Sequence, residues 1–144
     1  MAELYPALEQ RLAAVLRDPE EARDMAQEAY LRAYRGWSTF DGTDARAWLY
    51  TIGLRLAFNE LRRRKRWRAF LQRSWPMEWT PSVDPDLWQA LARLEPRHRA
   101  ALVLHVVDGY TQAELGRMLD VPSGTVASWI SRAKAQLRTE LEER

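Results

Sequence analysis

The sequence predicts an all-α fold made of two small helical modules that are joined by a short linker. Apolar residues recur at helical spacing along most of the chain, and no alternating apolar and polar run indicates a strand. Three of the 7 prolines lie at positions 76, 81 and 85, among serine and threonine, which is typical of a linker. We therefore expect modules at residues 1–73 and 87–144, with the linker at 74–86.

The first module is predicted to hold three helices. Apolar residues at helical spacing indicate a short first helix: Leu4, Leu8, Leu12 and Val15. The second helix begins with an aspartate at the N-cap, a proline at N1 and a glutamate at N3, in the run Asp18-Pro-Glu-Glu. It is expected to end near Gly36. A loop over residues 37–43 then leads to a long third helix, from about Asp44 to near Arg66.

Four helix signals make up the second module. Asp84-Pro85 and Pro96 each begin a helix, and Asp108-Gly109 ends the second of these. The run Thr111-Gln-Ala-Glu has the spacing of a capping box, and its helix ends near Leu119. After a turn at residues 120–123, a last helix runs to about residue 141. This is the layout of a helix-turn-helix, whose second helix enters the major groove of DNA, although such layouts also arise by chance.

Composition excludes several classes of function. The chain has no cysteine, so disulfides, thiolate metal sites and cysteine nucleophiles are absent. Its 2 histidines, His98 and His105, lie seven residues apart without carboxylates placed to complete a metal site, and no glycine-rich phosphate loop occurs. We expect no cofactor, no metal and no enzymatic activity. With no apolar run near the ~20 residues of a membrane span and no signal peptide, we expect a cytoplasmic protein without membrane insertion.

The net charge of +2 hides a basic cluster at residues 61–75, which carry 7 basic and no acidic side chains. On a helical wheel, one side of the third helix is apolar: Ala45, Leu49, Ile52 and Leu56, flanked by Ala57 and Leu61. The other side forms a polar stripe: Trp48, Thr51, Arg55, Asn59, Arg62 and Arg66. A solvated face and a nucleic-acid-binding face both fit this stripe. The basic cluster favours a nearby polyanion, because its charges repel one another.

Two further helices have distinct faces. The second helix is expected to bury one set of residues: Ala22, Met25, Ala26, Ala29, Tyr30, Ala33 and Trp37. Its outer set is Asp24, Gln27, Glu28, Leu31 and Arg35, in which the leucine fits a protein-docking face and a stray exposed leucine equally well.

The last helix is expected to bury Val126, Ile130, Ala133, Leu137 and Leu141. Thr125, Ser128, Arg132 and Ala135 face outward with Ser131 beside them, and Trp129 at the edge of the core is read as a packing residue. The tryptophans at 67, 75 and 79 fit either an interaction peptide or core packing.

Two stretches resemble the bacterial sigma factors of the extracytoplasmic-function group. Similarity to the family's region 2 covers residues 24–35 (DMAQEAYLRAYR), Phe40, residues 48–52 (WLYTI) and residues 59–66 (NELRRRKR). Similarity to its region 4 covers residues 94–102 (LEPRHRAAL), 109–115 (GYTQAEL) and 121–128 (VPSGTVAS). The two matches occur in the family's order, with its variable linker between them.

This resemblance implies a role for each face. The outer set of the second helix (Asp24, Gln27, Glu28, Leu31, Arg35) would dock on core RNA polymerase. The opened −10 element of promoter DNA would contact Phe40, Trp48, Thr51, Arg55, Asn59, Arg62, Arg63 and Arg66, with Phe40 capturing a flipped base. The −35 element would contact Ser123, Thr125, Ser128, Ser131 and Arg132. Anti-sigma proteins commonly cover these surfaces.

The chain departs from the family at three positions: Arg55 stands where asparagine is usual, and Ala127 and Trp129 stand where basic residues are usual. The function expected is that of a sigma factor, which binds core polymerase and directs promoter-specific initiation. The alternative is a sigma-like or helix-turn-helix regulator that binds DNA without engaging polymerase. An enzyme is the third and most distant interpretation.

Overall fold

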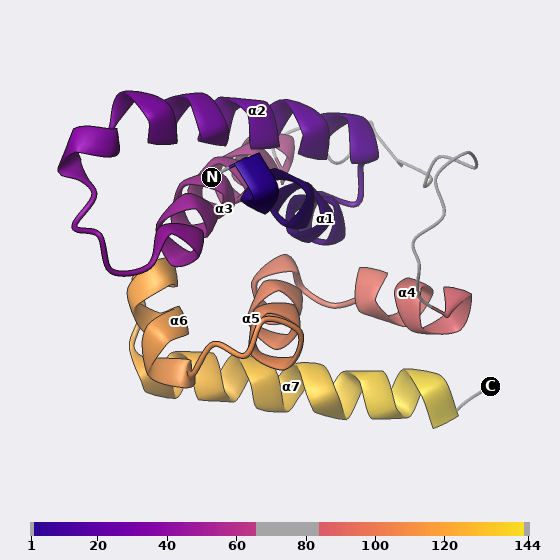
Figure 1. Cartoon of the computed structure of the whole chain (residues 1–144). Coiled ribbons are helices and arrows are strands. Elements are labelled where there is room, and N and C mark those ends of the chain that lie inside the picture. Colours follow the sequence, from indigo (N-terminus) through magenta and orange to yellow (C-terminus); the bar gives the residue numbers. More distant parts are fainter. Residues whose placement is uncertain (1, 66–83, 143–144) are drawn as a thin grey trace. The chain divides into compact units, whose positions relative to one another are not determined.

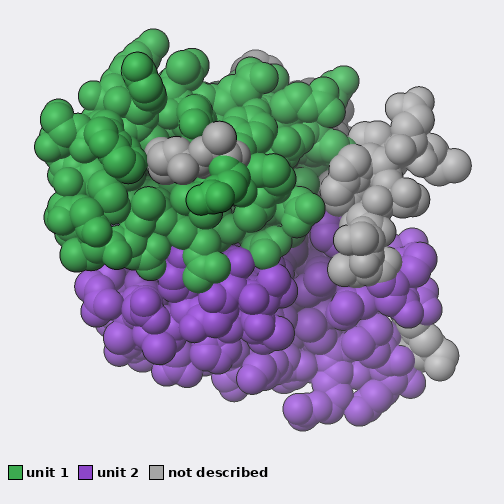
Figure 2. Space-filling model, viewed as in Figure 1, with its two compact units in different colours: residues 1–77 green, residues 78–144 purple. Residues whose placement is uncertain are grey.

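The structure is a computed structural model that describes residues 2–65 and 84–142, and its regular elements in these ranges are all helical (Figure 1). The chain forms two compact units, residues 1–77 and 78–144, which Figure 2 distinguishes by colour. Several predicted features lie outside the described residues: Arg66, the tryptophans at 67, 75 and 79, and the linker up to residue 83. The all-α fold class is confirmed.

The first unit consists of η1 (Ala2–Leu4), α1 (Tyr5–Leu16), α2 (Pro19–Arg35), η2 (Trp37–Thr39) and α3 (Ala45–Lys65). Helices α1, α2 and α3 pack against one another. The expected cap at Asp18 is present, because its side chain accepts a hydrogen bond from the backbone N–H of Glu21 at 3.2 Å. Asp44 does the same for α3 through the N–H of Ala47, at 3.0 Å.

Small side chains form the contact surface of α2. Four alanines, spaced so that they share one face of the helix, are fully buried: Ala22, Ala26, Ala29 and Ala33. Their size lets the backbones of neighbouring helices come close, and the larger residues of the core come from α1 and α3. This part of the expected buried face is confirmed.

The buried face of α3 differs from the one expected on the helical wheel. Leu49 and Ala57 are buried as expected, but Ile52 and Leu56 are only half-buried. Tyr50 and Leu54 take their place in the core at 0% and 2% exposure. The reason is that α3 contacts both α1 and α2, so its buried arc is wider than one apolar stripe and is turned toward both partners.

The second unit consists of α4 (Pro85–Ala92), α5 (Pro96–Val106), α6 (Gln112–Leu119) and α7 (Ser123–Glu142). In Figure 1, α7 runs past α6, α5 and α4, and it packs against all three. The capping box is confirmed: the hydroxyl of Thr111 accepts from the N–H of Glu114 at 3.1 Å, and the Glu114 carboxylate accepts from the N–H of Thr111 at 3.0 Å.

The core of the second unit ends earlier along α7 than its apolar spacing predicts. Val126, Ile130 and Ala133 are buried, but Leu137 is half-buried and Leu141 is 40% exposed. Here α7 lies against the short helix α4, and polar contacts hold the two together. Glu140 accepts a hydrogen bond from Arg93 at 2.7 Å. The expected burial of Leu141 is wrong, because this residue is exposed.

Arg99 is a buried charged residue that helical periodicity did not predict. It is 3% exposed, and its Nη1 donates to the carbonyl oxygen of Leu94 at 2.9 Å and to those of Leu91 and Ala92 at 3.4 Å. These carbonyls belong to the C-terminal end of α4 and the turn that follows it. The last carbonyls of a helix lack partners within that helix. The side chain of Arg99, which belongs to α5, therefore caps the C-terminal end of α4.

Candidate functional site

The outer face of α2 presents the five side chains expected there to solvent. Asp24, Gln27, Leu31 and Arg35 are exposed, with Leu31 at 46%. Glu28 is partly covered, because its carboxylate accepts a hydrogen bond from the Nε of Arg32 at 2.9 Å. An exposed apolar side chain among charged ones, on a helix whose opposite face is fully buried, provides a surface to which another protein could bind.

The polar stripe on α3 is also present. Arg55, Asn59 and Arg62 are exposed, and Trp48 and Thr51 are half-buried. The Nη2 of Arg62 donates to the amide oxygen of Asn59, so these two side chains lie together. The hydroxyl of Thr51 donates to the carbonyl oxygen of Ala47 at 2.7 Å, which occupies its one hydrogen-bond donor within the helix. Arg66, the last member of the stripe, lies outside the described residues.

One arginine of the basic cluster is paired with an acidic residue. Glu60, directly before the cluster, accepts hydrogen bonds from the Nε of Arg63 at 3.0 Å and from its Nη2 at 2.5 Å. The hydrogen bonds and the charge of Glu60 raise the pKa of Arg63. A count of acidic side chains within residues 61–75 misses this partner, and Arg63 is less available to a phosphate than Arg55 or Arg62.

Three aromatic rings meet at the loop between α2 and α3. Phe40 stacks on Trp48 with a centroid separation of 5.0 Å and an interplanar angle of 25°. Trp37 lies 5.2 Å from Phe40 and 6.0 Å from Trp48. We refer to Trp37, Phe40 and Trp48 as the aromatic cluster. Sequence reasoning placed Trp37 on the buried side of α2, but this residue is 49% exposed, because α2 ends at Arg35 and helical periodicity does not extend beyond it.

Local hydrogen bonds at Thr39 and Thr43 stabilise this loop. The N–H and hydroxyl of Thr39 donate to the carbonyl oxygen of Gly36 at 2.9 and 2.7 Å. The N–H and hydroxyl of Thr43 donate to the carboxylate of Asp41 at 3.0 and 2.7 Å, and these bonds lower the pKa of Asp41. The loop thus has local hydrogen bonds on both sides of Phe40.

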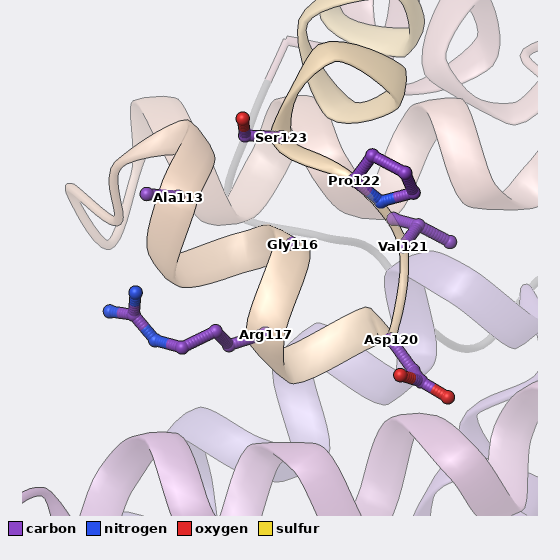
Figure 3. Close-up of a pocket in the computed structure, with 7 residues that line it drawn as sticks. All are labelled: Ala113, Gly116, Arg117, Asp120, Val121, Pro122 and Ser123. Carbon is purple, nitrogen blue, oxygen red and sulfur yellow. The ribbon is translucent and has the colours of Figure 1, made fainter.

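Gly116 brings α6 close to the turn before α7. A Cβ at this position would lie 2.7 Å from the carbonyl oxygen of Val121, so only glycine fits. The N–H of Val121 donates to the carbonyl oxygen of Gly116 at 2.9 Å and completes the contact. An open hollow of about 510 Å³ lies here, between α6 and the N-terminus of α7 (Figure 3). In Figure 3, Arg117 and Asp120 on its rim point in opposite directions.

The outward face of α7 carries the residues expected there. Ser123, Ser128, Ser131 and Arg132 are exposed and Thr125 is half-buried. They lie within the first three turns of the helix. Sequence reasoning did not select the exposed Arg117 on α6, which lines the same hollow as Ser123. Its position on the polar side of the capping-box helix is the signal that could have identified it.

Trp129, His98 and His105 each lie close to another residue of the second unit. The ring of Trp129 is half-buried and lies 6.1 Å from that of His98, in keeping with a packing residue. The Nε2 of His98 is 3.6 Å from a Glu95 carboxylate oxygen, and the Nδ1 of His105 is 2.7 Å from the carbonyl oxygen of Tyr110. Among the described residues, no group of three or more potential metal ligands gathers. No helix within those residues has the length and apolar character that crossing a bilayer requires.

Comparison with known proteins matches both units. Residues 1–67 match Sigma-70 region 2, and residues 85–137 match Sigma-70, region 4. The ECF RNA polymerase sigma factor SigL of Mycobacterium tuberculosis is 32% identical over 138 residues, which cover 88% of this chain and 77% of SigL. SigE of Mycolicibacterium smegmatis, also an ECF RNA polymerase sigma factor, is 33% identical over 136 residues, 84% of this chain and 52% of SigE.

A solved structure has the same fold. The sigma factor RpoE from Bartonella quintana, in complex with the anti-sigma factor NepR, superposes with a TM-score of 0.84 at 23% identity, over 98% of this chain and 93% of that one. The chain spans only about half of the length of SigE. The match to SigL and the two region matches, in order along the chain, decide the family. The chain belongs to the sigma-70 family of RNA polymerase sigma factors, in its extracytoplasmic-function group.

Proposed function

We propose that this chain binds core RNA polymerase and directs initiation at specific promoters. In this proposal the outer face of α2 docks on polymerase, the loop and stripe of the first unit hold the opened −10 element, and α7 reads the −35 element. The observation that carries it is that one chain combines a region 2 unit and a region 4 unit, each with most of the described residues of its expected face exposed. The chain acts by binding alone and catalyses nothing, and its place is the cytoplasm, where polymerase works.

The described side chains suit these roles chemically. Leu31 can enter an apolar pocket while Asp24 and Arg35 pair with charges around it, which is the arrangement of a core and rim at a protein interface. Arg55 and Arg62 can hold phosphates, and the aromatic cluster can stack on an unpaired base. On α7, Arg132 can donate two parallel hydrogen bonds to a guanine in the major groove.

Regulation by an anti-sigma protein is part of the proposal. A protein that covered the outer face of α2 would compete with polymerase for the same side chains. The relative RpoE was solved in complex with the anti-sigma factor NepR, which supports looking for such a partner. Loss of binding to both polymerase and the anti-sigma partner on one substitution in α2 would support a shared surface.

The test is binding to core polymerase from the source organism, followed by transcription. The full chain is mixed with core polymerase and analysed by size-exclusion chromatography, and run-off transcription from fragmented genomic DNA then identifies its promoters. Leu31→Glu should abolish binding while retaining helicity, because the side chain is exposed and contributes little to folding.

Val106→Glu is the matched control. It also places a charge on an exposed apolar residue, 63% exposed, but in α5 of the second unit. It should bind polymerase like the wild type. Wild-type binding by Leu31→Glu would remove α2 from the docking role. Binding of the unaltered chain to DNA but not to polymerase would favour the alternative, a DNA-binding regulator that does not engage polymerase.

A further inference from the structure

The helix proposed to read the −35 element, α7, carries few charges near its start. Over residues 123–133, which make its first three turns, Arg132 is the only charged side chain. The affinity of a protein for duplex DNA comes largely from basic side chains that neutralise phosphates. A second cation close to the start of α7 would therefore strongly affect how firmly this helix is held in a groove.

Arg117 on α6 is such a cation. Its side chain is exposed and lines the hollow between α6 and the start of α7, together with Ala113 one helical turn before it. Of the 7 residues that line the hollow, Arg117 is the only basic one. Within the part of the chain that the structure describes, its guanidinium forms no ion pair and no hydrogen bond. The positive charge is thus free to bind a ligand.

One acidic side chain also lines the hollow, but it does not pair with this charge. Asp120 follows the last residue of α6 and adopts the left-handed conformation, at φ 58°. In Figure 3 its carboxylate and the guanidinium of Arg117 point in opposite directions. The side of the rim that carries Arg117 is therefore positive, which suits an anion.

The contact at Gly116 sets the position of Arg117 relative to α7. The carbonyl oxygen of Gly116, the residue before it, accepts from the N–H of Val121 in the turn at 2.9 Å. In a helix-turn-helix the second helix enters the major groove by its N-terminal residues, while the first helix crosses the backbone. The phosphates that border the groove would then pass beside the hollow, within reach of a long arginine side chain.

We propose that Arg117 binds a backbone phosphate of duplex DNA and so holds α7 in the major groove. This rests on the proposed function for the role of α7, but it adds a contact from α6 and does not require polymerase. Phosphate contacts set the position of a protein on the duplex and carry no sequence information. Arg117 should therefore strengthen binding equally on all duplexes, unlike a base-reading side chain such as Arg132.

Binding of the full chain to duplex DNA tests this. The probes are two fluorescein-labelled duplexes of unrelated sequence, and fluorescence anisotropy measures binding over a series of salt concentrations. Arg117→Ala should reduce the slope of log K against log salt concentration by about 0.9 on both duplexes, the value for one lost phosphate contact. Arg117→Lys keeps the charge and should retain the wild-type slope. A merely structural role of Arg117 would not change this slope.

Arg138→Ala is the matched control. Arg138 is also exposed and unpaired within the described residues, but it lies far from the hollow. Its position on α7 is about 9 Å beyond Arg132 and about 120° around the helix from it. Its removal should leave the slope on both duplexes unchanged. A wild-type slope for Arg117→Ala, an equal change for Arg138→Ala, a reduced slope for Arg117→Lys, or no binding of the unaltered chain to either duplex would each overturn the proposal.

The outcome is independent of the polymerase experiment. Arg117→Ala should still bind core polymerase, because the outer face of α2 is untouched. Should the unaltered chain fail to bind polymerase while Arg117→Ala lowers the slope on both duplexes, the proposed function falls and the phosphate contact stands. The reverse result, polymerase binding with a wild-type slope for Arg117→Ala, removes only the phosphate contact.

Discussion

Replacement of Gly116 by alanine is the substitution whose consequence the structure fixes most closely. The added Cβ would lie 2.7 Å from the carbonyl oxygen of Val121 and 3.3 Å from the backbone nitrogen of Ser123. Both atoms belong to backbone, so no side chain can turn aside to make room. The turn has to move away from α6, and α7 begins in that turn. Gly116→Ala should therefore both destabilise the second unit and displace the helix expected to read DNA.

We expect Gly116→Ala to lower the free energy of unfolding of the second unit by about 2 kcal/mol, the middle of the range for overpacking a tight site. For a unit of this size, that corresponds to a fall in Tm of roughly 8 to 16 °C. Hydrogen exchange followed by mass spectrometry on the full chain measures the effect separately in each unit. Peptides from α5, α6 and α7 should exchange faster, and peptides from α1, α2 and α3 should be unchanged.

Gly124→Ala is the matched control. Nothing lies within 4 Å of a Cβ at Gly124, which is in the first turn of α7. Alanine there should leave stability unchanged or raise it by about 0.5 kcal/mol, because it restricts the unfolded chain. If Gly116→Ala stays within about 0.5 kcal/mol of the wild type, or if both glycine variants shift alike, the steric argument is refuted.

Charged side chains of both units give three more predictions. Arg55→Ala should reduce the slope of log K against log salt concentration, for binding to single-stranded DNA, by about 0.7. Arg63→Ala should reduce this slope by less, because a glutamate on the same helix holds its guanidinium. Fluorescence anisotropy over a salt series measures both. Arg132→Ala should lower transcription about tenfold on promoters that depend on the −35 element and little on others, and equal loss on both would contradict base reading. The NMR signal of the Thr43 amide should be constant above the ordinary aspartate pKa of about 3.9, because the ionised carboxylate of Asp41 accepts its hydrogen bond. The signal should change as the pH falls through the lowered pKa of Asp41. An unchanged signal would contradict this.

Local signals in the sequence determined the helices and much of the candidate site. The caps at Asp18 and Thr111 act within three residues of their own position, so their geometry could be predicted without any partner. The same holds for the outward placement of Leu31, Arg55 and Arg132, because helical periodicity assigns them to the side opposite the alanines, leucines and valines. The functional roles of these faces remain predictions that came from the resemblance.

Only the tertiary structure decided which arc of each helix is buried and which side chains meet across the chain. Tyr50 is in the core because α3 has two partners, and Arg99 is buried because the end of α4 needs donors that a neighbouring helix supplies. The exposure of Trp37 depends on where the chain turns after α2. Periodicity carries no information on the number of packing partners or on the path of a loop, because both are set by contacts between segments far apart in sequence.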